Sequence, residues 1–108
     1  MSDYPEVPEV DVHEAKRRVE AGAYFIDVRE PDEYQEARIP GAHLLPLSSF
    51  ATRYQAELPK EREIVVHCRS GRCSSQVTEF LLEHGYQAVN VGGGILAWGE
   101  EELPLERG

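Results

Sequence analysis

The sequence predicts an α/β fold with a central parallel sheet flanked by helices on both faces. Two observations point to this class. Short apolar runs of strand length alternate with stretches of helical period, and alternation at such short intervals is typical of parallel sheets covered by helices. The chain has 108 residues, 41% of them hydrophobic, which suffices for one core and leaves no room for a second catalytic domain. We therefore expect one domain over residues 1–108, with its core at about 7–104 and a short tail at each end.

The first helix is expected at about residues 12–21. Asp11 can serve as its N-cap, with Glu14 three residues later, and Gly22 is a good stop signal. The apolar run at 23–28 comes next. It is long enough for a buried strand and too short for a helix, so it is the first strand that the pattern predicts.

A second, short helix is expected over residues 31–37, because proline suits the first position of a helix and acidic residues follow it. A turn and a brief strand at 43–47 come next. Ser48 or Ser49 is expected to cap a third helix, which Pro59 closes.

The second half of the chain continues the alternation. The run at 62–68 is the most strand-like stretch in the sequence, and 73–85 is a clear amphipathic helix. Another strand is expected at 87–93 and a short helix at 94–101. The glycines at 92–94 are expected to form the turn between them.

Composition and charge exclude several classes of function. The formal net charge of −9 repels phosphate backbones and anionic lipids, so we expect neither nucleic acid nor membrane as a partner. No apolar run approaches the ~18 residues of a membrane span, and the first ten residues lack the features of a secretion signal. The expected compartment is the cytoplasm, which would keep both cysteines as thiols.

The stretch VVHCRSGRCSS at residues 65–75 carries the strongest functional signal. In parallel α/β sheets, ligands bind at the carboxyl ends of the strands, and Cys68 falls at such an end. The loop after it is short, and its backbone N–H groups converge with the first turn of the next helix on a point that favours negative charge. Gly71 permits a positive φ, and the small Ser70 keeps the approach open.

Cys68 is expected to be a nucleophile. The helix N-terminus and the side chains of Arg69 and Arg72 favour thiolate over thiol, and we expect the sulfur to be open to solvent. The alternative is a buried structural cysteine that follows a core strand. For the two arginines, the alternative is a pair of surface salt bridges. The basic and small neighbours favour the reactive interpretation of the cysteine.

Four stretches of the sequence resemble, in order and spacing, the signatures of a single-domain rhodanese, a thiosulfate sulfurtransferase-like family. They are FIDVREPDEY, IPGAHLLPL, VVHCRSGRCS and VNVGGGILAW, and the resemblance covers about residues 7–104. It implies the rhodanese-like fold, with a sheet of about five parallel strands between helices. It also implies a six-residue active loop that begins with the sulfur-carrying cysteine: Cys68, Arg69, Ser70, Gly71, Arg72 and Cys73.

The chemistry that the resemblance implies fits the residues of the loop. The Cys68 thiolate would attack the outer sulfur of thiosulfate or a similar small anionic donor, release sulfite and keep a persulfide. A thiol or cyanide would then take up that sulfur, and a sulfur-carrier protein is a further candidate partner. Loop amides would stabilise the persulfide, and Arg69 and Arg72 would attract the donor. No cofactor is expected.

The sixth position of the loop departs from the family pattern. Many single-domain members carry Arg there, whereas this chain has Cys73, with Arg72 one place earlier. Either the neighbouring arginine replaces the missing one or the choice of donor differs. Cys73 is a candidate resolving thiol that attacks an oxidised or persulfidated Cys68; the alternative is a small residue packed in the first helical turn.

Asp27 and Arg29 lie at the carboxyl end of the strand at 23–28. The resemblance suggests that they support the active loop by hydrogen bonding, and the alternative is a structural ion pair with each other or with Glu33. His67 precedes the nucleophile, but neighbouring residues of a strand point to opposite faces, so His67 is expected to pack in the core or on the sheet surface. The histidines and cysteines have no zinc-like spacing, and no metal is expected.

Two rival functions stay open. Phosphatases and arsenate reductases of related folds use a similar cysteine loop, but theirs is one residue longer and ends in Arg, where this chain has Ser74. The shorter loop suits the smaller sulfur centre. The other rival is a binding module or slow sulfur relay of the same fold. A non-catalytic module would most simply lack the cysteine, and Cys68 is present.

Overall fold

The computed structural model describes residues 7–107, so the expected tail at 1–6 lies outside the described residues. The strands of its main sheet are β1 (Glu9–Val10), β2 (Tyr24–Asp27), β4 (His43–Leu44), β5 (Glu63–His67) and β6 (Gln87–Val91). All five run parallel, in the order β1-β6-β5-β2-β4. The predicted parallel sheet is confirmed, and β5 lies at its centre.

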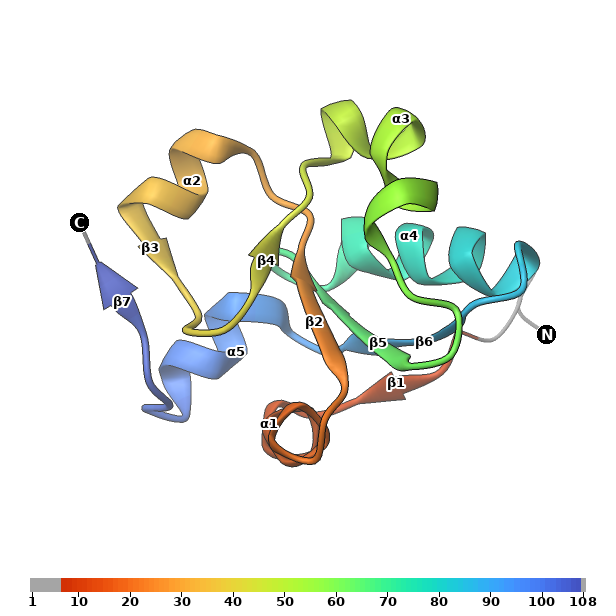
Figure 1. Cartoon of the computed structure of the whole chain (residues 1–108). Helices are drawn as coiled ribbons and strands as arrows, with labels where there is room; N and C mark the ends of the chain where they lie inside the picture. The colour runs from red at the N-terminus through yellow and green to blue at the C-terminus, as the bar shows by residue number, and fades with distance from the viewer. Residues whose placement is uncertain (1–6, 108) are drawn as a thin grey trace, which may run out of the picture.

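Five helices surround this sheet: α1 (Val12–Glu20), α2 (Pro31–Glu36), α3 (Leu47–Glu57), α4 (Arg72–Glu83) and α5 (Gly94–Glu100). Figure 1 shows α3 and α4 on one face of the sheet and α1 and α5 on the other. Helices on both faces of a parallel sheet are the arrangement that the alternating pattern predicts, and that part of the prediction is confirmed as well.

The two faces of the sheet divide the core into two layers. Ile64 and Val66 of β5 pack among side chains of α3 and α4, whereas Val65 between them packs with α1 and α5. All three are fully buried, as expected for a central strand covered on both sides. Trp98 anchors α5 in the second layer, and its indole N–H donates to the Pro104 carbonyl at 2.7 Å.

Local capping signals were reliable for α1 and misleading for α3. The Asp11 carboxylate accepts a hydrogen bond from the Glu14 N–H at 2.8 Å, as predicted. α3, however, begins at Leu47 after Pro46 and has no side-chain cap, so the prediction of a cap at Ser48 or Ser49 is wrong. The Ser48 N–H and hydroxyl instead donate to the Glu30 carboxylate, an acceptor that is distant in sequence.

Three very short strands have no counterpart in the prediction. β1 adds a fifth strand beside β6, with Glu9 opposite Asn90. β3 (Ala37–Arg38) and β7 (Glu106–Arg107) form a separate antiparallel pair, next to α2 in Figure 1. The expectation of a tail after residue 104 is therefore wrong. Each of these two-residue strands contains a charged residue and lies outside any apolar run, unlike β4, which falls in the apolar run at 43–47, so the sequence does not reveal them.

Among residues 7–107, no helix has both the length and the apolar composition needed to cross a bilayer. The longest described helix, α4, has 12 residues. At 1.5 Å per residue, a helix of that size spans about 18 Å, which is well short of the ~30 Å hydrocarbon core.

Candidate active site

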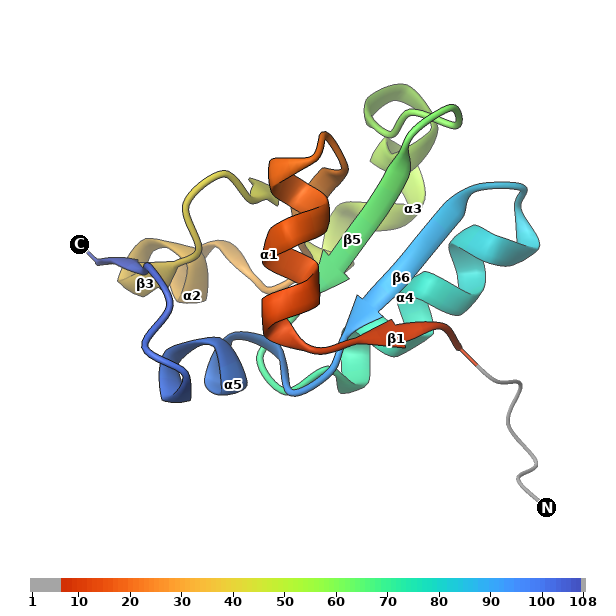
Figure 2. The same ribbon diagram turned by 90° about the horizontal axis from the view of Figure 1, so that it is seen from below.

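The candidate nucleophile lies where β5 ends and the chain turns into α4. β5 ends at His67, so Cys68 is the first residue beyond the strand, at the carboxyl edge of the sheet. Figure 2 shows this connection beside the start of α5. Cys68 is only 4% exposed, since its side chain packs with the apolar layer under α3 and α4. The expectation of a sulfur open to solvent is therefore wrong: the loop folds over the thiol.

Backbone amides of the loop form a cradle around the sulfur. The N–H groups of Gly71 and Ser74 donate to Cys68 Sγ at 3.2 and 3.3 Å. Gly71 has a φ of +97° and directly precedes α4, so the positive φ predicted for this glycine is confirmed. A Cβ at this position would also lie 3.1 Å from the Val91 carbonyl oxygen, so the loop is pressed against the end of β6.

Two opposing effects act on the Cys68 thiol. Burial raises its pKa. Hydrogen bonds from Ser74 and from the amides of Gly71 and Ser70 lower it by a larger amount, so the pKa of Cys68 is below the ordinary value. Arg69 and Arg72 were expected to produce this effect, but both side chains are exposed. The groups that lower the pKa are the Ser74 side chain and the peptide N–H groups of Ser74, Gly71 and Ser70.

The first turn of α5 is hydrogen-bonded to the backbone of the loop. The Ile95 and Leu96 N–H groups donate to the carbonyls of Cys68 and Arg69 at 2.9 and 3.1 Å. Gly94 allows this contact, because a Cβ there would lie 2.5 Å from the Arg69 carbonyl oxygen and in similar conflict with that of Cys68. Sequence reasoning treated the glycines at 92–94 as a turn and missed the role of this one.

Ser74 and Asn90 were not singled out as site residues either, and both are buried beside the loop. The Ser74 hydroxyl donates to Asn90 Oδ1 at 2.5 Å. Ser74 therefore links Asn90 to the sulfur, to which its own N–H donates at 3.3 Å. A signal for Asn90 was present: it is the one polar residue between two valines of an apolar strand.

A comparison with known families assigns this fold and loop. The rhodanese-like domain profile matches residues 11–101, most of the chain. The chain belongs to the rhodanese-like domain family. The resemblance inferred from the four sequence signatures is therefore confirmed, as is the rhodanese-like fold.

Individual relatives agree with this assignment. The putative sulfurtransferase YtwF of Bacillus subtilis is 38% identical over 92% of this chain and 97% of its own. Thiosulfate sulfurtransferase PspE of Escherichia coli is 38% identical over 69% of this chain and 73% of its own. These relatives support sulfurtransferase activity in general.

Solved structures give the same result. A rhodanese-related protein from Thermoplasma volcanium superposes with a TM-score of 0.85 at 28% identity, covering 92% of this chain and 97% of that one. The reduced CoADR-RHD of Bacillus anthracis matches with a TM-score of 0.81 at 38% identity over 86% of this chain. This chain spans only 16% of that protein's length.

The other residues of the rhodanese loop face outward. Arg69, Ser70, Arg72 and Cys73 are all exposed. Within residues 7–107, neither arginine forms an ion pair, so both guanidinium groups are available to an anion. Arg69 lines a cavity of about 400 Å³ between the loop, α2 and α5, whereas Ser70 and Arg72 line a groove beside α4. Cys73 is a free thiol, and its resolving role stays a prediction.

Asp27 and Arg29 form a buried ion pair beneath the loop. Arg29 donates to both carboxylate oxygens of Asp27, with the shortest contact at 2.8 Å, and to the carbonyls of Glu33 and Ala37. Within the described part of the chain, neither side chain bonds to residues 68–73. The predicted hydrogen bonds from this pair to the loop are therefore not formed. The structural ion pair, which was the alternative interpretation, is the arrangement found.

His67 is fully buried, as predicted, and lies next to this pair. Its Nε2 is 3.6 Å from an Asp27 oxygen and has no hydrogen-bond partner. Burial lowers its pKa, although the Asp27 carboxylate acts in the opposite direction. A neutral imidazole that faces away from the sulfur is not suited to act as a base for Cys68. Across residues 7–107, no cluster of His, Cys, Asp and Glu could hold a metal ion.

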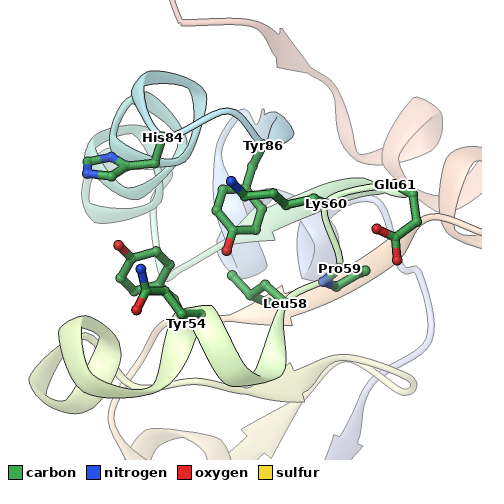
Figure 3. Close-up of a pocket in the computed structure, with 8 residues that line it drawn as sticks. Tyr54, Leu58, Pro59, Lys60, Glu61, His84 and Tyr86 are labelled. Atoms are coloured by element: carbon green, nitrogen blue, oxygen red, sulfur yellow. The ribbon is translucent and has the colours of Figure 1, made fainter.

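A separate cavity of about 510 Å³ opens far from the loop, between the end of α3 and the end of α4 (Figure 3). Tyr54, Lys60, His84 and Tyr86 line it, and the Lys60 ammonium lies 5.1 Å from the centre of the Tyr86 ring. Lys60 and Tyr86 precede β5 and β6, so this cavity is at the amino edge of the sheet. Cys68 lies at the opposite, carboxyl edge of the sheet.

Proposed function

We propose that this protein is a thiosulfate-type sulfurtransferase that carries sulfur as a persulfide on Cys68. The observation that carries the proposal is the pair of N–H donors at 3.2 and 3.3 Å from a cysteine sulfur whose pKa is lowered. A thiolate held in this way is a nucleophile near neutral pH, and the same donors suit the charge of a terminal persulfide sulfur.

The first step transfers sulfur to the enzyme. The Cys68 thiolate attacks the outer sulfur of thiosulfate, a new S–S bond forms, and the S–S bond of thiosulfate breaks. Sulfite leaves with the electron pair of that bond, so no external oxidant or reductant is required.

The second step returns the enzyme to its starting state. An acceptor nucleophile such as cyanide or a thiolate attacks the outer sulfur of the persulfide, and the Cys68 thiolate leaves. A sulfur-carrier protein could serve as the acceptor if it presents its nucleophile on a protruding chain. Two half-reactions of this kind give ping-pong kinetics.

The surroundings of Cys68 fit a small anionic donor. A side chain that is 4% exposed admits only small reagents or protruding atoms. Arg69 and Arg72 place two exposed positive charges beside the loop of a protein with a net charge of −9, so they are where a dianion would be drawn. We place this chemistry in the cytoplasm, where reduced thiols are available to regenerate the enzyme.

Intact mass spectrometry after incubation with thiosulfate tests the proposal. We expect a gain of about 32 Da, one sulfur atom, which peptide mapping places on Cys68. Cys68→Ser should gain nothing, whereas the matched control Cys73→Ser, which removes the other thiol, should gain the full increment. Thiocyanate formation from cyanide should likewise be lost in Cys68→Ser and kept in Cys73→Ser.

Other outcomes would reassign the protein. Sulfur uptake without cyanide turnover would favour the slow relay over the enzyme. Hydrolysis of an aryl phosphate without sulfur uptake would contradict the proposal and favour the phosphatase alternative.

A further inference from the structure

Asn90 makes direct contact with both residues whose N–H groups hold the sulfur. It lies on β6 between Val89 and Val91, whose side chains pack toward α1 and α5, so the side chain of Asn90 points to the opposite face, under the start of α4. Its Oδ1 accepts the Ser74 hydroxyl at 2.5 Å, and its Nδ2 donates to the Gly71 carbonyl at 3.1 Å.

The hydrogen-bond partners of the Asn90 amide fix its orientation. The second Nδ2 hydrogen goes to Glu9 Oε1 at 3.2 Å, so both donors and the acceptor of the side chain are used. Exchanging its oxygen and nitrogen would place the oxygen against two acceptors, the Gly71 carbonyl and the Glu9 carboxylate. Asn90 is 1% exposed, so these contacts are shielded from bulk solvent.

We propose that Asn90 is a positioning residue for sulfur transfer, holding Gly71 and Ser74 so that their N–H groups converge on Cys68 Sγ. This inference rests on the proposed function. Asn90 acts through the other two residues: it anchors Gly71 at its carbonyl and Ser74 at its hydroxyl. The Ser74 side chain also lowers the pKa of Cys68, so Asn90 fixes the place of this group as well as of the two N–H donors.

Two variants separate the two contacts. Asn90→Leu keeps the branching at Cγ, with somewhat bulkier methyl groups, and removes every hydrogen bond of the amide without adding charge. Asn90→Asp keeps an acceptor for the Ser74 hydroxyl but loses the donor to the Gly71 carbonyl. Glu9→Gln is the matched control, because it changes the third partner of the amide while leaving an oxygen acceptor in place.

The amide resonances of Gly71 and Ser74, followed by NMR while Cys68 is titrated, report the two N–H···S contacts directly. The Cys73→Ser background leaves Cys68 as the only thiol. We expect both amide shifts to respond to ionisation of the thiol in the parent protein and in Glu9→Gln. In Asn90→Leu both responses should fall by at least half, and in Asn90→Asp only that of Gly71 should fall.

The rate of alkylation by iodoacetamide as a function of pH gives a second readout. The midpoint should rise by about one pH unit in Asn90→Leu, a tenfold loss of thiolate below the midpoint. A residue with only a structural role would lower the melting temperature and leave both readouts unchanged, which would overturn the inference. If Asn90→Leu does not fold, Asn90→Ala decides, because it removes the amide without adding bulk or charge: an unchanged Gly71 response there overturns the inference.

These readouts do not depend on sulfur donors. If the parent protein takes up no sulfur from thiosulfate while the amide responses change as expected, the proposed function fails and the positioning of the sulfur by Asn90 stands. If the parent protein takes up sulfur normally and the amide responses do not change in the Asn90 variants, the positioning role of Asn90 fails and the proposed function stands.

Discussion

Gly94 offers a sharp test of how α5 supports the active loop, through the substitution Gly94→Ala. The added Cβ would lie 2.5 Å from the Arg69 carbonyl oxygen and in conflict with that of Cys68, and both are backbone atoms that cannot rotate away. Residue 94 also has a φ of +57°. Left-handed backbone costs an alanine about 1–2 kcal/mol, and an extra methyl group in filled space costs about 1–3 kcal/mol. We therefore expect the free energy of unfolding to fall by about 2–5 kcal/mol.

Gly41→Ala separates the two contributions to this loss. Gly41 has a φ of +87°, but a Cβ there would meet nothing within 4 Å, so only the backbone cost applies. Urea unfolding should show a clearly larger loss for Gly94→Ala than for Gly41→Ala. Sulfur uptake by Cys68 should fall at least tenfold in the first and stay unchanged in the second. Equal losses of stability, or a fully active Gly94→Ala, would refute the view that α5 and the loop are in close contact.

Three further predictions follow from the buried ionisable groups. Because the pKa of Cys68 is lowered, the stabilisation from its ionisation is complete above the ordinary pKa of 9.0 and is lost as pH falls through the folded value; alkylation should show a midpoint below 9.0. Asp27→Asn leaves the Arg29 guanidinium buried without its carboxylate, so the free energy of unfolding in urea should fall by about 3–5 kcal/mol. Glu57→Gln, which breaks an exposed ion pair, should change the free energy of unfolding much less. The pKa of His67 is also lowered in the folded protein, so as the pH decreases the imidazole is protonated in the unfolded chain before it is protonated in the folded one. The free energy of unfolding should therefore decrease at pH values below about 6.5, and it should decrease less in His67→Gln.

Each of these predictions has a contrary outcome. An alkylation midpoint at or above 9.0 would mean that burial outweighs the hydrogen bonds to Cys68. Equal effects of Asp27→Asn and Glu57→Gln would mean that the buried pair is not a support of the fold. An unchanged acid dependence in His67→Gln would assign the loss of stability to other groups.

Most of the fold could be predicted because its long elements carry strong periodic signals. The apolar run of β5 and the amphipathic pattern of α4 identified the parallel α/β class. β1, β3 and β7 have two residues each and depend on pairing with distant segments, so no local pattern marks them. The capping of α3 was mispredicted for a related reason, because the acceptor for Ser48 is Glu30, far away in the sequence.

The residues of the candidate site also divide into those that a local sequence pattern marks and those that depend on distant segments. The Cys68 loop was found because one short stretch holds the cysteine, the glycine and the helix start that anion binding requires. Ser74, Asn90 and Gly94 were missed because their roles depend on how β6 and α5 approach the loop in space. The exposure of Cys68 was mispredicted since a sequence does not show that the loop closes over its own side chain.

The pairing of β1 with β6 has a consequence for how the protein is made. Glu9 lies beside Asn90, so the sheet joins one of the first described segments to one of the last. A chain emerging from the ribosome therefore lacks Asn90 and the turn at Gly94 while Cys68 is already translated. Until those later residues have been made, the contacts that Asn90 and Gly94 make with the loop cannot form, so the environment of Cys68 depends on segments translated after it.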